Sequence, residues 1–168
     1  DLNATGSRYA PLQLANLQQK NVDGWLLGHI HKPNLILNSK DPWVLYPGSP
    51  QALDPGEQGI HGCWIVELGS DDHPVFIPMS TVCYETFTVD ITPCEQIEDV
   101  QGYVVAKAKS KAVEIKAESH AGLQAVVLRI EVVGECADPV SVRELLKGHT
   151  EWDYWLDETA VWVDKLQV

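Results

Sequence analysis

The segment Trp25-Leu26-Leu27-Gly28-His29-Ile30-His31-Lys32-Pro33 joins an apolar run to a polar turn. The apolar run predicts a buried β-strand, which ends where glycine, histidine and proline interrupt the pattern. One residue separates His29 from His31, so a locally extended backbone would direct both imidazoles to the same side. Neutral imidazole is the commonest side-chain ligand of transition metals, and Gly28 would allow a turn or a close approach to a metal cluster. The segment therefore predicts a strand that ends in two metal ligands.

An isolated His-x-His pair has a simpler interpretation, which is a polar strand end. Two histidines also cannot complete a binuclear metal site, because such a site holds two ions about 3.5 to 4 Å apart and needs several further ligands. The sequence around the pair has to decide between these interpretations.

The surrounding sequence predicts a small sheet with loops. Upstream, the spacing of apolar residues from Pro11 to Leu17 predicts a short amphipathic helix that begins with proline. Downstream, four short apolar runs predict strands at residues 35–37, 43–46, 62–68 and 75–79. We assign residues 1–82 to a first domain.

From Val82 onward the pattern becomes strand, helix, strand, helix, strand. Apolar residues alternate along the first two predicted strands, and the second of these carries Val126, Leu128, Ile130 and Val132 on one face. A last predicted strand runs through residues 160–166. Thr92-Pro93-Cys94-Glu95 predicts a capping box for the first helix, and Asp138-Pro139 predicts the start of the second, which ends at Lys147-Gly148. Residues 83–168 therefore form a predicted α+β module whose helices cover one face of a sheet.

Composition limits the possible functions. The formal net charge of −12 argues against broad electrostatic capture of nucleic acid, because phosphate binding depends mainly on lysine and arginine. No apolar run reaches the roughly 20 residues needed to cross a bilayer, so we expect a cytoplasmic protein without a membrane partner. The four cysteines contain no C-x-x-C pair, which favours buried free thiols. Because the chain starts at Asp1 in a loop-like stretch, we expect it to be an excised piece.

Several other groups have both a functional and a structural interpretation. Pro47-Gly48-Ser49-Pro50 could fix a turn or present Gly48 and Ser49 to a phosphate, and His61 is a weak candidate for a phosphate contact but more often a hydrogen-bonded loop residue. Asp71-Asp72-His73 matches a ligand pair, although its position between two predicted strands favours a solvated turn. For the basic cluster, a solvated helix face is favoured over a DNA-binding groove. For the last three tryptophans, core packing or a protein interface is favoured over stacking surfaces for unpaired bases. These two groups are Lys107, Lys109, Lys111 and Lys116, and Trp152, Trp155 and Trp162.

Four motifs taken together resemble the closing motifs of calcineurin-like metallophosphoesterases. They are Ser7-Arg8-Tyr9-Ala10-Pro11, Gly28-His29-Ile30-His31, Tyr46-Pro47-Gly48-Ser49-Pro50 and Gly59-Ile60-His61-Gly62-Cys63-Trp64. More narrowly, residues 7–68 resemble bacterial DNA-repair exonucleases of the SbcD type. The resemblance implies that residues 1–82 are the C-terminal sheet portion of a four-layer αββα metallophosphoesterase domain, followed by a small α+β capping domain at residues 83–168.

The same resemblance implies a site with two divalent metal ions, Mn²⁺ being the expected metal. In that family five motifs build the site, and Gly-His-x-His is the last of them. His29 would ligate the metal held by an upstream asparagine and a lone histidine, and His31 the metal of an upstream Asp-x-His pair. The bridging aspartate and the catalytic histidine would also lie upstream, so we expect no catalytic residue in this chain and no activity from it alone.

The implied function of the intact protein is hydrolysis of DNA phosphodiester bonds by a DNA-repair exonuclease. The family implies an SbcC-like coiled-coil ATPase as partner and often a homodimer, in addition to DNA. Two alternatives remain open, because the histidine motif does not select a substrate. The first is a phosphoesterase acting on small nucleotides or phosphoproteins, and the second is a non-catalytic interaction module whose acidic second domain is a docking surface.

Overall fold

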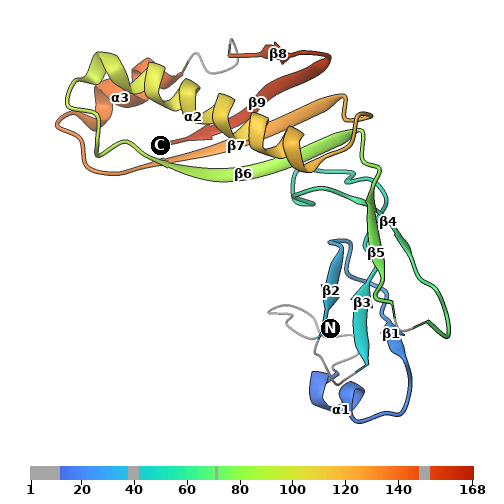
Figure 1. The fold of residues 1–168 in the computed structure, drawn as a ribbon. Helices are drawn as coiled ribbons and strands as arrows, with labels where there is room; N and C mark the ends of the chain where they lie inside the picture. Colours follow the sequence, from blue (N-terminus) through green and yellow to red (C-terminus); the bar gives the residue numbers. More distant parts are fainter. Residues whose placement is uncertain (1–11, 38–41, 71, 148–151) are drawn as a thin grey trace. The chain divides into compact units, whose positions relative to one another are not determined.

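The computed structural model describes residues 12–37, 42–70, 72–147 and 152–168. Two units can be distinguished, and each is described by itself (Figure 1). The first unit comprises Asp1–Gln51 and His61–Met79, and the second comprises Ala52–Ile60 and Ser80–Val168. The division into domains at residues 1–82 and 83–168 stays a prediction. Within the described ranges, no helix is long and apolar enough to cross a membrane.

A three-stranded sheet forms the centre of the first unit. Helix α1 (Leu14–Gln18) precedes strand β1 (Gly24–Leu26), and β2 (Asn34–Ile36) and β3 (Trp43–Tyr46) follow. Strand β3 lies in the middle, parallel to β1 and antiparallel to β2. Val44, Leu45 and Tyr46 of β3 are buried, as expected for a central strand. The predicted helix and all three strands are thus confirmed, but the predicted helix start at Pro11 is wrong, because α1 begins at Leu14 and Gln13 before it has extended backbone. Pro11 itself lies outside the described residues.

The first unit also contains a β-hairpin. Strands β4 (Gly62–Ile65) and β5 (Val75–Pro78) pair in antiparallel register, which confirms both predicted strands, with shorter bounds. Between them, the Asp72 amide donates to the Ser70 hydroxyl across 3.1 Å, and Asp72 and His73 are exposed. These two residues lie in the solvated turn that the sequence favoured over a metal site, while Asp71 lies outside the described residues.

The second unit is a four-stranded sheet covered on one face by two helices (Figure 1). Strands β6 (Val82–Asp90), β7 (Ala125–Val133) and β9 (Thr159–Gln167) are parallel, and the short β8 (Tyr154–Leu156) forms a hairpin with β9. Helices α2 (Ile97–Glu118) and α3 (Pro139–Leu146) connect the parallel strands. This arrangement confirms the predicted α+β class, with helices on one face of a sheet.

The core of the second unit lies between this sheet and the two helices. Alternate residues of β7 point into it, as the sequence predicted, and α2 contributes one buried residue per turn. Buried core residues include Val126, Leu128, Ile130, Val132, Val100, Val104, Ala108, Ala112, Val142 and Leu146. The strand period of two and the helix period of 3.6 thus bring the apolar side chains together.

The two predicted helix starts have different outcomes. Asp138 caps α3 as predicted, because its side chain accepts hydrogen bonds from the amides of Val140 and Ser141. The predicted capping box at Thr92 is wrong, since α2 begins at Ile97 and its N-terminus has no side-chain cap. The Thr92 hydroxyl instead accepts from the Glu135 amide across 3.0 Å. Thr92 therefore links the connections that follow β6 and β7 rather than starting the helix.

The C-terminal tryptophans do not all pack in the core. Trp152 packs partly buried against it, but Trp155 is 72% exposed and Trp162 47% exposed. Core packing is therefore wrong for Trp155 and Trp162, while the alternative of a protein interface stays a prediction. The cause is strand alternation, which places their neighbours on the inner face and these two side chains on the outer face. The sequence had predicted β9 but not β8, which carries Trp155.

Candidate metal-binding site

The candidate site lies at one edge of the first sheet, where strands β1 and β3 end. Because these strands are parallel, the residues after Leu26 and Tyr46 leave the sheet on the same side. The Leu27 amide donates to the Leu45 carbonyl across 2.8 Å and extends the pairing by one residue. Ligands of parallel sheets commonly bind beyond the carboxyl ends of the strands. The His-x-His loop after β1 and the Pro-Gly-Ser-Pro turn after β3 meet at this edge.

The backbone of the His-x-His loop differs from the expected extended strand. His29 has a φ of 80°, in the left-handed region that residues other than glycine rarely adopt. Extended backbone is therefore wrong at His29. Gly28 has no positive φ, and a Cβ added there would have no protein atom within 4 Å, so the backbone does not require glycine at this position, while a close approach to a metal cluster stays a prediction. The imidazoles of His29 and His31 are both exposed, and uncommon backbone conformations of this kind cluster at functional sites.

The turn after β3 forms a direct hydrogen bond with this loop. The Ser49 amide donates to the His31 carbonyl across 2.8 Å. Gly48 has a φ of 75°, and a Cβ added there would lie 2.6 Å from both the His31 oxygen and the Pro33 nitrogen. Only glycine fits between the turn and the loop. Since the Ser49 amide is engaged with His31, it does not face outward toward a phosphate, whereas substrate contact by Gly48 or by the Ser49 hydroxyl stays a prediction.

His61 lies behind the turn with a fully buried side chain. Its Nδ1 atom lies 2.9 Å from the Ser49 hydroxyl oxygen and 3.0 Å from the Ser49 carbonyl oxygen. These contacts are those of the hydrogen-bonded loop histidine that the sequence favoured. In this position His61 contacts Ser49 of the turn, and through Ser49 it can influence a ligand.

Two further residues support the turn, and the sequence had assigned no role to either. Trp64 on β4 donates its indole N–H to the Pro47 carbonyl across 3.2 Å. Gly62 allows the hairpin strands to approach, because a Cβ there would lie 2.1 Å from the Ile77 carbonyl oxygen. Both belong to the motif Gly59–Trp64, which was the signal in the sequence that could have pointed to them. Their contacts could not be predicted from local pattern, because the partners Pro47 and Ile77 are distant in sequence.

The donor chemistry of the loop fits part of a metal site. Two exposed imidazoles are suitable ligands for transition metals such as Mn²⁺ or Zn²⁺. In the described ranges, no group of three or more histidine, cysteine, aspartate or glutamate residues could hold a metal ion. His29 and His31 would therefore serve as two ligands among several, and the others would have to come from residues that the structure does not describe.

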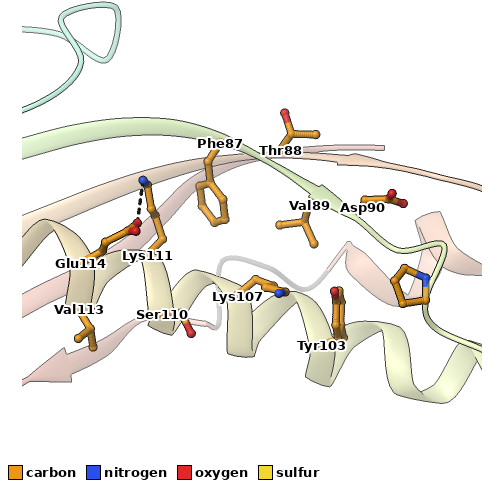
Figure 2. A pocket seen from close by; sticks show the side chains of 11 residues that line it. Phe87, Thr88, Val89, Asp90, Tyr103, Lys107, Ser110, Lys111, Val113 and Glu114 are labelled. Carbon is orange, nitrogen blue, oxygen red and sulfur yellow. Dashed lines mark hydrogen bonds and ion pairs between the residues drawn. The ribbon is translucent and has the colours of Figure 1, made fainter.

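The basic cluster of the second unit is held by local partners on and around α2. Lys107 lies 5.1 Å from the centroid of the Tyr103 ring, and Lys111 forms an ion pair with Glu114 at 2.9 Å. These residues line a pocket of about 540 Å³ between α2 and β6 (Figure 2). Of the other two lysines, Lys109 stacks over the Tyr154 ring, and Lys116 binds Asp157. No histidine or cysteine lines the pocket, so its residues suit a helix surface better than a metal site.

The comparisons with known proteins support a relationship with metallophosphoesterases, which are hydrolases that use divalent metal ions. A protein of Bacillus subtilis (strain 168), described as the uncharacterized metallophosphoesterase YhaO, is 33% identical over 90 residues. The aligned residues cover 53% of this chain but only 22% of that relative. No family model matches the chain. No solved structure matches it either.

Proposed function

We propose that this chain is part of a metal-dependent phosphodiesterase in which His29 and His31 ligate divalent metal ions. The observation that carries the proposal is the exposed histidine pair at the carboxyl end of β1, held by a backbone hydrogen bond to the turn after β3. The similarity to a metallophosphoesterase supports it independently. If the two imidazoles were only part of a polar strand end, the loop that carries them would not need a hydrogen bond to the turn after β3.

Divalent metal ions in such a site supply Lewis acidity toward a phosphoryl oxygen and acidify water at neutral pH. The contribution of this chain is to hold two neutral imidazoles in fixed positions. The backbone of His31 is held by Ser49, and the turn containing Ser49 is in turn held by His61 and Trp64. Rigid support of this kind keeps ligands near the geometry that a metal requires.

For the intact protein we propose two metal ions, with Mn²⁺ as the physiological metal, and DNA as the substrate. The SbcD-type motifs favour DNA, while the net charge of −12 requires the attraction of phosphate to come from the metals and nearby groups. We also propose the family's partners, an SbcC-like ATPase and a second copy of the protein. The 168-residue chain alone should be inactive, because its described residues provide only two suitable ligands at this edge.

The substrate can be tested on the whole protein with Mn²⁺ present. We expect cleavage of single-stranded DNA with little hydrolysis of cyclic nucleotides. The reverse preference would reject DNA and support the alternative of a small-nucleotide phosphoesterase, which the acidic charge of this chain favours. If the whole protein hydrolyses neither substrate and binds no metal, the non-catalytic alternative would replace both.

A further inference from the structure

We propose that His61 is a positioning residue for the metal ligand His31 and acts on it through Ser49. The buried imidazole fixes Ser49, and Ser49 holds the backbone carbonyl of His31. The relevance of this device to metal binding rests on the function proposed above. The hydrogen bonds among His61, Ser49 and His31 do not depend on that function.

The contacts determine which ring nitrogen of His61 carries the proton. A backbone carbonyl oxygen only accepts, so the 3.0 Å contact between His61 Nδ1 and the Ser49 carbonyl requires a proton on Nδ1. The same N–H lies 2.9 Å from the Ser49 hydroxyl oxygen, which then accepts as well. The hydroxyl proton of Ser49 is thereby directed to the His31 carbonyl oxygen at 3.5 Å. A His61 ring that carries a proton on Nδ1 satisfies all three contacts.

Both donors of Ser49 then converge on one oxygen atom. The amide donates to the His31 carbonyl across 2.8 Å, and the hydroxyl adds the longer contact on the second lone pair. Together they restrict the peptide group that follows the His31 side chain. Because His29 already has left-handed backbone, this restraint keeps a short and strained loop from relaxing.

His61 is itself fixed by the hairpin. Its carbonyl oxygen accepts from the Met79 amide across 3.0 Å, and Gly62 directly after it allows the close approach of β5. The imidazole is fully buried, so its position cannot adjust without moving the strands. The chain of contacts runs from the β4–β5 hairpin through His61 and Ser49 to His31.

Three substitutions separate positioning from simple packing. His61→Asn places an amide nitrogen where Nδ1 lies, while His61→Gln moves the amide one bond farther and His61→Leu removes the polar group. If only volume mattered, Gln and Leu would replace His better than Asn. If the Nδ1 donor matters, only His61→Asn should keep the restraint on Ser49.

The first measurement is made by NMR on the 168-residue chain without metal. We expect ¹⁵N shifts of the Nδ1–H tautomer for His61, and protection of the Ser49 amide from hydrogen exchange that is kept in His61→Asn. In His61→Gln and His61→Leu, exchange of that amide should be at least about tenfold faster, as expected when a local restraint is lost. An Nε2–H tautomer, or protection that follows side-chain volume, would overturn the proposal. The wild-type tautomer decides the question even if His61→Leu does not fold.

The second measurement is the affinity of the whole protein for Mn²⁺ by calorimetry. Loss of a group that orients a ligand typically weakens metal affinity roughly 10- to 100-fold. We therefore expect Mn²⁺ affinity to fall by about that factor in His61→Gln and to stay near the wild-type value in His61→Asn. If the NMR results hold but His31→Ala leaves Mn²⁺ affinity unchanged, the positioning of His31 stands and the proposed metal function fails. Wild-type affinity in His61→Gln, with His31→Ala impaired, would count against positioning.

Discussion

The amide of Ser49 donates to the carbonyl oxygen of His31 across 2.8 Å, although 18 residues separate the two in the chain. This hydrogen bond joins the loop after β1 to the turn after β3. The two motifs that the sequence linked to phosphoester chemistry therefore form one structural element. A change in the turn should affect the histidine pair even where it touches no ligand.

Replacement of Gly48 by alanine should destabilise the chain and disturb this element. The new Cβ would clash with the backbone of His31 and Pro33, and the φ of 75° is unfavourable for alanine. We expect a loss of roughly 1–3 kcal/mol in the free energy of unfolding, measured by urea denaturation. The matched control is Gly28→Ala, whose Cβ would contact nothing, with an expected change within about 0.5 kcal/mol. Equal losses in both variants would refute the close contact at Gly48.

The thiols should differ strongly in reactivity. Burial and the nearby Glu85 carboxylate raise the pKa of Cys83 to about 12, as its predicted burial implies. The predicted burial is wrong for Cys63, which is exposed on β4. With iodoacetamide in the native state, Cys63 should be labelled more than roughly tenfold faster than Cys83. Cys83 should remain the slower thiol at both pH 7 and pH 9, because its thiolate stays a minor species at every pH below its pKa, even though its own labelling rate rises with pH. Peptide mapping by mass spectrometry measures both rates, and rapid labelling of native Cys83 would contradict its burial.

The cap of α3 gives the second unit a defined pH dependence. Hydrogen bonds from Ser141, and more weakly from Val140, lower the pKa of Asp138 below the ordinary value of 3.8. A depressed pKa contributes stability that is present above the unfolded value and lost as the pH falls through the folded value. The wild type should therefore exceed Asp138→Asn in stability at pH 6, and the difference should vanish in acid. Urea midpoints between pH 2 and 6 test this, and a difference that persists at pH 2 would argue against an ionised cap.

Regular periodicity made most of the fold predictable from the sequence. The alternation of Val126, Leu128 and Ile130 located β7, and Asp138-Pro139 located the start of α3. The Thr92 capping box failed because the hydroxyl has a partner, Glu135, that is distant in sequence. Local pattern cannot reveal such competition between a cap and a long-range hydrogen bond.

The candidate site was only partly predictable for the same reason. The motif predicts His29 and His31 as ligands, and that assignment stays a prediction. Left-handed backbone at His29 and the contact of His61 with Ser49 depend on loops that meet only in the folded chain. The spacing of 12 residues between His61 and Ser49 carries no periodic signal.

The central claim is that His31 ligates a metal ion used for phosphodiester hydrolysis. Its most direct test is Mn²⁺-dependent hydrolysis of single-stranded DNA by the whole protein carrying His31→Ala, with His73→Ala in the exposed β4–β5 turn as the matched control. The account predicts a loss of more than roughly 100-fold for His31→Ala, because a ligand is removed, and wild-type activity for His73→Ala, with both variants folded by circular dichroism. Wild-type turnover by His31→Ala at the same Mn²⁺ concentration would contradict the claim.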